Sequence, residues 1–377
     1  EPMSGRMIGL SANVPFPGKI AAARTAAAQD TVTAGARLTE QERTVARDIK
    51  LAYFEIYHLD RGIMTNESHT RALDDLLIAA RAKLADGRAT QAEVLDLELE
   101  RLDIMSQIVR DRATLAMRRA ELERACGGSG RTNLSDGAAS LQMPARLALP
   151  ELTTSLGGLD SLAVTSRPLL AALRSEAEVE QRAARRAELE AYPDVTVTLE
   201  YMQRDALSAT SPMNPTNTAA AARLGIQPMA MMQPDLLSLN LSLPLPLQLS
   251  GQRSAAIAEA DAMRTMKLSE ARETELEIHA ELASQLAMLK GLRDEYDLLL
   301  REVYPAVRAR LATSYANYTY GKATIEQVLR DDLAMLHREH DRYRLEAEYN
   351  KTLALIEYLV GRDLVRYASA PDSEERH

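Results

Sequence analysis

An internal repeat constrains this chain more than any other feature of its sequence. Residues 84–97 read LADGRATQAEVLDL and residues 318–331 read YTYGKATIEQVLRD, which aligns Gly87 with Gly321 at an offset of 234. An earlier pair aligns residues 10–19 (LSANVPFPGK) with residues 241–250 (LSLPLPLQLS) at an offset of 229, and both stretches contain Pro-x-Pro. Because the two matches are collinear, we infer that the chain contains two copies of one structural unit.

Each copy predicts two long helices. A long helical segment follows the Pro-x-Pro and leads to the aligned glycine, and a shorter one then leads to Gly127 or Gly361. The first segment has roughly 70 residues and the second about 38, so at about 1.5 Å per residue the helices would be about 105 Å and about 57 Å long. A compact domain does not hold a helix of the first length, whereas a coiled-coil rod or a tube does.

Three short stretches alternate apolar and polar residues, with the period of a β-strand. Such strands, of about nine residues with one apolar face, resemble membrane-spanning strands. The alternative is a half-buried strand of a soluble sheet. Three strands between helices of about 100 Å would not form a stable soluble sheet, so we favour the membrane interpretation. The stretches are residues 7–16, 195–201 and 237–243, and a polar, exposed loop is predicted at 203–234.

Composition sets limits on function. The net charge of −9 disfavours a general nucleic-acid binder. The single cysteine, Cys126, excludes an internal disulfide and a cysteine-based zinc cluster. No run of 18 apolar residues and no signal peptide is visible. No Walker loop, zinc-protease, nucleophile-elbow or dinucleotide motif is present, so we expect neither an enzyme nor a cofactor.

The motifs at the aligned glycines resemble those of the TolC-like outer-membrane efflux factors. The signature of that family, Tyr-x-x-Gly-x-x-[Ser/Thr], reads Tyr318-Thr319-Tyr320-Gly321-Lys322-Ala323-Thr324 here, and the first copy reads Leu84 to Thr90 with Gly87. The PFPGK and PLPL stretches look like the heavy-metal branch, the CusC and CzcC relatives. The resemblance covers essentially the whole chain.

The resemblance implies a mainly α fold with a small transmembrane β part. Three copies would form a homotrimer, in which each chain gives strands to a β-barrel and long helices to an α-barrel crossing the periplasm. The implied division is a first repeat (1–127), an equatorial linker (128–167), a second repeat (168–361) and a C-terminal tail (362–377). We expect low order over 126–167 and a shorter helix over 168–191. The lead-in before the Pro-x-Pro is far longer in the second copy than in the first, so we expect an N-terminally truncated chain lacking one helix and one strand.

The resemblance also suggests a periplasmic gate close to the aligned glycines. Tyr318 matches the gating tyrosine of the family, and Glu93 and Asp96 match its pore-facing carboxylates. In the second copy, Gln327 and Arg330 stand at the acidic positions, and we raise the hypothesis of an Asp96–Arg330 contact between neighbouring hairpins. The alternative is that Glu93 and Asp96 are solvated charges on a helix surface.

The two helical turns are the predicted docking tips for an adaptor protein. Glycine is suited to the left-handed conformation that ends a helix. Arg88 and Lys322 flank the turns and would pair with acidic groups of a partner, although an ordinary helical corner with solvated cations has the same sequence. The predicted tip residues are Asp86, Gly87, Arg88, Tyr320, Gly321 and Lys322.

No metal site is firmly predicted. Four methionines of the loop, whose thioethers would suit Cu(I), are weak candidates, although methionine also fills apolar gaps. His337 and His340 have the spacing of a metal pair, but we expect both to lie on a helix surface. The methionines are Met213, Met229, Met231 and Met232.

The resemblance therefore implies an outer-membrane exit duct of a tripartite, RND-type efflux system in a Gram-negative bacterium, with heavy-metal cations as the expected cargo. Its partners would be two further copies, a periplasmic membrane-fusion adaptor, an inner-membrane RND pump and outer-membrane lipid, and not nucleic acid. Export of drugs or organic compounds and type I protein secretion are alternatives within transport. A soluble coiled-coil scaffold is the alternative from another class.

Overall fold

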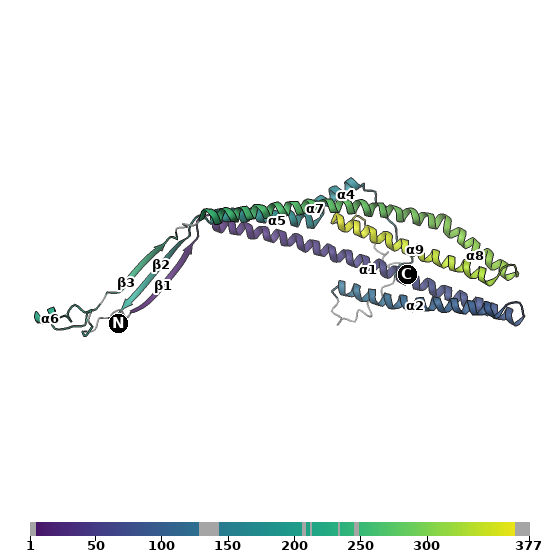
Figure 1. Ribbon diagram of the computed structural model, residues 1–377, viewed down its shortest axis with the longest axis horizontal. Coiled ribbons are helices and arrows are strands. Elements are labelled where there is room, and N and C mark those ends of the chain that lie inside the picture. Colours follow the sequence, from purple (N-terminus) through teal and green to yellow (C-terminus); the bar gives the residue numbers. More distant parts are fainter. Residues whose placement is uncertain are drawn as a thin grey trace, which may run out of the picture. The chain divides into compact units, whose positions relative to one another are not determined.

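The computed structural model describes residues 5–127, 143–205, 209–211, 213–232, 234–244 and 249–365 (Figure 1). These residues form two units. The first comprises residues 1–34 and 173–270, and the second comprises residues 35–172 and 271–377. In the described residues, no helix is both long enough and apolar enough to cross a membrane. The predicted linker and tail fall partly at 128–142 and 366–377, outside the described residues.

The first unit holds an antiparallel sheet of three strands in the order β1–β2–β3 (Figure 1). The strands β1 (Gly5–Val14), β2 (Val195–Arg204) and β3 (Leu236–Ser242) coincide with the predicted stretches, apart from small shifts at their ends. The short helix α6 (Ala219–Arg223) lies in the loop before β3. That loop folds around Asn214, whose side chain is fully buried and donates to the carbonyl oxygen of Met229 at 2.6 Å.

One face of this sheet is apolar, and it is exposed. The register places Leu10, Leu199 and Leu239 in one row, and Ile8 and Leu237 with Tyr201 in the next. Leu10 is 75% exposed and Leu239 is 69% exposed, values ordinary for charged rather than apolar residues. The other face is polar, and there the Ser11 and Thr198 hydroxyls lie 3.1 Å apart. The sequence alternation thus produces a two-faced sheet whose apolar face has no cover within the described residues.

Most of the other described residues lie in helices. The first long helix is α1 (Lys19–Ala85), and its 67 residues agree with the predicted length. It is followed by α2 (Gln91–Ala125), α4 (Leu156–Ser166) and α5 (Pro168–Leu189). The second copy contains α7 (Leu249–Leu298), α8 (Tyr304–Thr319) and α9 (Ile325–Val360).

A single π-helical turn, η1 (Leu299–Val303), joins α7 to α8. The sequence pattern predicts an uninterrupted helix here. Pro305 follows this turn, and a proline ring lacks an N–H and collides with the carbonyl four residues before it. The wider π turn relieves that collision and keeps the chain helical.

Helix α4 corrects the prediction of low order for residues 156–166, whereas residues 128–142 of the same predicted segment lie outside the described residues. The hydroxyl of Ser155 caps this helix by accepting from the Gly158 N–H at 3.3 Å. Leu159 and Ala163 are almost fully buried, in a core that also contains Leu282 and Leu353. The glycine-rich composition suggests disorder, but Leu159 and Ala163 have helical spacing, and their burial holds α4 against the core.

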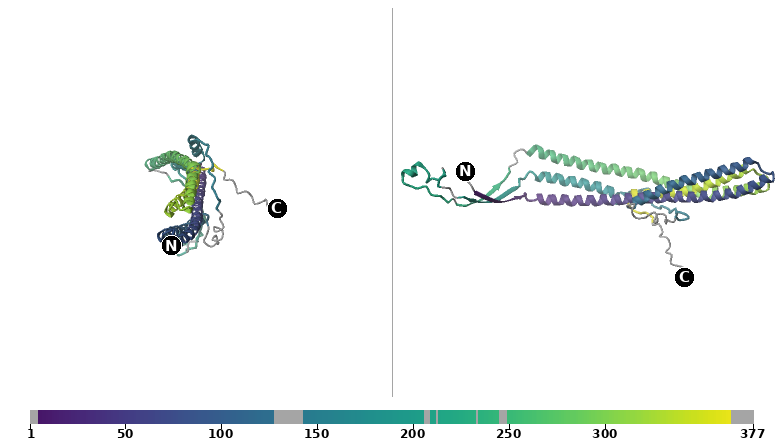
Figure 2. Two further views of the ribbon diagram at one scale, coloured as in Figure 1. Left: turned by 90° about the vertical axis from the view of Figure 1, so that its right-hand side faces the viewer. Right: turned by 90° about the horizontal axis from the view of Figure 1, so that it is seen from below.

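The second unit contains two apolar cores. One lies among α1, α2, α8 and α9 and includes Tyr57, Leu73, Leu97 and Ile325. The other lies among α4, α7 and α9. The first core extends along both helical hairpins, α1–α2 and α8–α9, to their turns, which lie at the same end of this unit (Figure 2). This packing positions the candidate site.

Candidate functional site

The turn of the first hairpin is a Schellman motif built on Gly87. Its φ is +68°, in the left-handed region that favours glycine. The N–H of Gly87 donates to the carbonyl of Leu84 at 3.0 Å, and the N–H of Arg88 donates to that of Lys83 at 2.8 Å. Helix α2 then begins after Thr90, whose hydroxyl accepts from the Glu93 N–H.

The turn of the second hairpin repeats this arrangement bond for bond. Gly321 has a φ of +71°, and its N–H donates to the carbonyl of Tyr318 at 3.1 Å. The N–H of Lys322 donates to the carbonyl of Asn317 at 2.8 Å, and Thr324 caps α9 through the Gln327 N–H. Each donor and acceptor follows its counterpart at the offset that aligns Gly87 with Gly321, so the sequence repeat is also a structural repeat.

The side chain of Tyr318 lies inside the second unit, against α1. It is buried with only 7% exposed, and the Lys83 ammonium lies 3.3 Å from its ring centroid. The same ammonium donates to the Tyr318 carbonyl oxygen at 3.0 Å. Burial, together with the nearby charge of Glu93, raises the pKa of the Tyr318 phenol. Of the other predicted gate residues, Glu93 therefore lies close enough for its charge to act on the Tyr318 phenol.

The other predicted gate residues lie along α2 and α9 and are more exposed. Arg330 pairs with Glu326 of its own helix at 2.8 Å, across a surface that is mostly solvated. Gln327 donates to Asp331 at 3.0 Å. Asp96 is exposed. The hypothesis of an Asp96–Arg330 contact between neighbouring hairpins stays a prediction.

The predicted docking residues are exposed at the two turns. Tyr320 is 79% exposed, and Asp86, Arg88 and Lys322 are exposed as well. Open space surrounds Gly87 and Gly321. Side chains with this freedom are available for contact with another molecule, but their docking role stays a prediction.

Two buried polar clusters lie behind the turns, and the sequence pattern does not reveal them. In the first, Asp331 is 1% exposed, accepts from the Ser314 hydroxyl and pairs with Arg310 at 2.5 Å. Burial alone would raise the pKa of Asp331, but these hydrogen bonds and the Arg310 charge lower it overall. An acidic residue on a charged helix carries no sequence signal for such burial.

The second cluster joins the two hairpins through His69 of α1. One ring nitrogen of His69, Nδ1, lies 3.2 Å from Asp332, and the other, Nε2, lies 3.4 Å from Glu339, both on α9. Burial would lower the pKa of His69, but the two carboxylates outweigh it and raise that pKa to about 9. His69 is therefore an imidazolium at neutral pH, bridging two helices that are distant in sequence.

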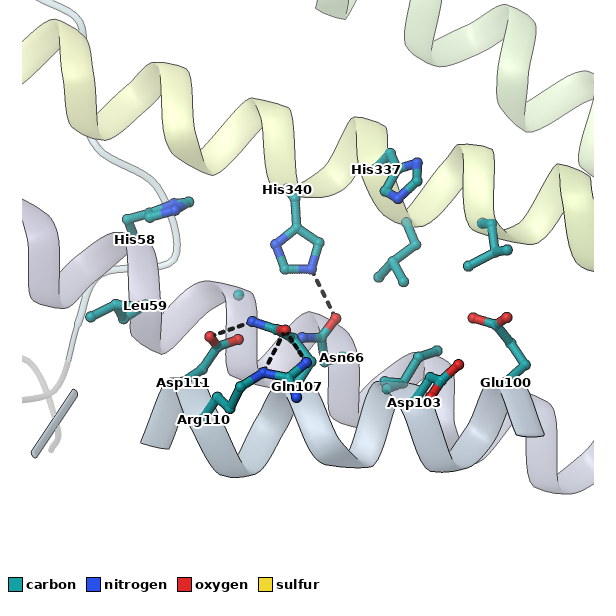
Figure 3. A pocket seen from close by; sticks show the side chains of 14 residues that line it. His58, Leu59, Asn66, Glu100, Asp103, Gln107, Arg110, Asp111, His337 and His340 are labelled. Carbon is teal, nitrogen blue, oxygen red and sulfur yellow. Dashed lines mark hydrogen bonds between the residues drawn. The ribbon is translucent and has the colours of Figure 1, made fainter. Parts of the chain in front are cut away.

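A cavity of 430 Å³ lies among α1, α2 and α9, close to this cluster (Figure 3). His340 points from α9 toward α1, and its Nε2 lies 2.8 Å from the Asn66 side-chain oxygen (Figure 3). Burial lowers the pKa of His340 and of His58. His337 is exposed, as predicted, whereas the prediction that His340 lies on the surface is wrong, because that side chain packs between two helices.

Within the described part of the chain, no group of three or more histidine, cysteine or acidic side chains is arranged to hold a metal ion. The four methionines considered as soft ligands are exposed in the loop before β3, where Met232 is 90% exposed.

Comparison with known proteins identifies the fold. No family model matches the chain, and no curated protein matches it. Among solved structures, the outer membrane protein VceC from Vibrio cholerae is 15% identical, with 96% of this chain and 87% of that chain covered at a TM-score of 0.71. The CmeC outer membrane channel of Campylobacter jejuni is 12% identical, with 95% and 71% covered and a TM-score of 0.75.

CusC, described as forming a transmembrane channel, is 13% identical, with 96% of this chain and 83% of that chain covered at a TM-score of 0.69. It matches no better than VceC or CmeC, so the comparison does not single out the heavy-metal branch. At these identities the likeness establishes the fold alone. The chain has the fold of outer-membrane channels.

Proposed function

We propose that this protein is the outer-membrane exit duct of a tripartite efflux system in a Gram-negative bacterium. The observation that carries the proposal is the exposed apolar face of the β1–β2–β3 sheet, where Ile8, Leu10, Leu237, Leu239 and Leu241 are each more than two-thirds exposed. A soluble protein rarely leaves such a continuous apolar surface open to water, whereas lipid covers it at no cost. The likeness in fold to outer-membrane channels supports the same assignment.

The repeat itself supports self-association. On α9, four side chains at helical spacing pack into the core of the chain. Their counterparts in the first copy, on α2, are 48–67% exposed. Because the two copies share one fold, we infer that a second copy of the chain covers the α2 row, as expected for helices that close into a homotrimeric tube. The pairs are Leu95 and Leu329, Leu99 and Leu333, Leu102 and Leu336, and Val109 and Tyr343.

In this trimer the two turns would form the periplasmic end of the duct. Glu93, Asp96 and Tyr318, with Gln327 and Arg330, would line or brace its gate. A threefold ring of carboxylates concentrates negative potential and favours cations. The exposed turn residues around Gly87 and Gly321 would dock a periplasmic adaptor, which links the duct to an inner-membrane RND pump.

The proposed division into repeats (1–127 and 168–361), a linker (128–167) and a tail (362–377) would then place the linker and tail in a belt around the tube. Such a duct performs no bond chemistry and needs no cofactor. Heavy-metal cations are the proposed cargo, supported by the acidic positions Glu93 and Asp96. The alternatives are drugs, organic compounds or secreted protein.

The cargo is tested by deleting the gene and measuring growth across copper, silver, zinc, cobalt and a set of antibiotics. We expect metal sensitivity that is restored by the intact gene. Sensitivity to antibiotics alone would move the cargo to organic compounds. A soluble scaffold predicts no change in either set, and that result would contradict the proposed function.

A further inference from the structure

Lys83 joins the ends of two helices that belong to different hairpins. It lies in the last turn of α1, and its ammonium reaches both the ring and the carbonyl oxygen of Tyr318 in the last turn of α8, at 3.3 and 3.0 Å. Within the described residues, this contact links the two turns directly. It combines a cation–π interaction with a charged hydrogen bond.

The location suits a positive charge. The carbonyl of Lys83 closes the first Schellman motif, and the carbonyl of Tyr318 accepts from Gly321 in the second. Both are therefore at the C-terminal ends of helices, where the helix dipole is negative. One ammonium thus lies beside the negative ends of two helices, and the side chain is shielded enough for the interaction to be only partly screened by water.

The Tyr318 hydroxyl takes no part in this contact. It is buried and has no hydrogen-bond partner among the described residues. The ring face and the main-chain carbonyl, rather than the phenol oxygen, hold the tyrosine against α1. A phenylalanine at this position would keep both contacts.

The sequence repeat does not duplicate this contact, because the equivalent positions of the two copies hold different residues. At the offset of 234, the counterpart of Lys83 is Asn317 and that of Tyr318 is Leu84. The first copy carries only the cation and the second only the ring. We call the contact of the Lys83 ammonium with the Tyr318 ring and carbonyl oxygen the clamp. It exists once, with the cation in the first hairpin and the ring in the second.

We propose that Lys83 is a positioning residue that holds Tyr318, and with it the second turn, against the first hairpin while the duct is closed. This inference rests on the proposed function. In this proposal the Tyr318 ring and its carbonyl oxygen, and not its hydroxyl, make the contacts that hold the second turn. Loss of the ammonium releases the second turn and leaves the pore more open.

The test is ion conductance of the purified full-length trimer in planar lipid bilayers, with trimer content checked by gel. Lys83→Met keeps the aliphatic stem and removes the charge, so we expect conductance to rise about tenfold or more. Lys83→Arg keeps a cation and is expected to conduct like the wild type. Arg81→Met is the matched control, because Arg81 is an exposed cation on the same helix end and pairs with Glu98 at the surface.

Two substitutions at Tyr318 separate the ring from the hydroxyl. We expect Tyr318→Phe to stay as closed as the wild type and Tyr318→Leu to leak like Lys83→Met. A closed Lys83→Met duct, or a Tyr318→Phe duct that leaks as much as Tyr318→Leu, would overturn the inference. If Lys83→Met does not assemble, the two Tyr318 variants decide alone.

If the protein is not a duct, the conductance measurement gives a different result. In that case no variant, Tyr318→Leu included, produces channel events, and both the duct and the clamp are refuted. Equal, measurable conductance in every variant refutes only the clamp.

Discussion

The link between the two hairpins through His69 leads to a quantitative prediction. His69 is 10% exposed and lies between the Asp332 and Glu339 carboxylates. Its pKa rises from 6.5 to about 9 in the folded chain, which corresponds to about 3 kcal/mol of stability. The lowered pKa of Glu339 has its bond to His69 as the first cause, so it belongs to the same interaction and is not counted a second time.

The sign of the pH dependence follows from the raised pKa. A histidine whose pKa is higher in the folded state contributes its full stability below pH 6.5, and that contribution disappears as the pH rises through about 9. Burial lowers the pKa values of His58 and His340, so their own effect on stability has the opposite pH dependence. Comparing the variant with the wild type at the same pH removes that shared effect.

We therefore expect His69→Gln to lower the free energy of unfolding by about 3 kcal/mol near pH 6.5 and by almost nothing near pH 10. The assay is urea unfolding of the detergent-solubilised protein, followed by helical circular dichroism at both pH values. Deuterium exchange at the imidazole carbon, read by mass spectrometry, gives the pKa of His69 itself. An equal loss at both pH values, or a pKa of His69 near 6.5, would contradict this role for His69.

Three further predictions concern the sheet, a helix end and the gate. Leu239→Lys should prevent assembly into the outer membrane, because a lysine on the lipid-facing side costs about 2–4 kcal/mol near the bilayer midplane. Asn240→Lys, on the polar face, should still assemble. Heat-modifiable migration on gels compares the two variants. Gly361→Ala should destabilise the chain more than Gly127→Ala in thermal unfolding, because the added Cβ would lie 2.7 Å from the Ser166 carbonyl oxygen at Gly361 and meet open space at Gly127; equal losses would contradict this. Arg330→Glu should increase leakage of large antibiotics into cells, and unchanged leakage would count against its gate role.

The repeat and the strands could be predicted because their signals are local. Alternation at period two identifies β1 and β3, and the aligned glycines Gly87 and Gly321 identify both turns. Glycine at a helix end has one dominant physical reason, the positive φ, so it is informative even without neighbours. The order in which the strands pair, β1–β2–β3, is supplied by the structure.

The contacts between the hairpins could not be predicted, because they depend on register over long separations. His69 and Asp332 are 263 apart in sequence, and Lys83 and Tyr318 are 235 apart. A histidine among charged residues has the same sequence pattern whether it is solvated or buried. For that reason the sequence places His340 on the surface, whereas it packs against α1 and contacts Asn66.

We propose that three copies of this chain form a duct in the outer membrane. The most direct measurement separates the cell into soluble, inner-membrane and outer-membrane fractions and determines the native mass of the detergent-extracted protein. We expect an outer-membrane protein with three times the mass of one chain. Recovery in the soluble fraction, or as a single chain in the membrane, would contradict it.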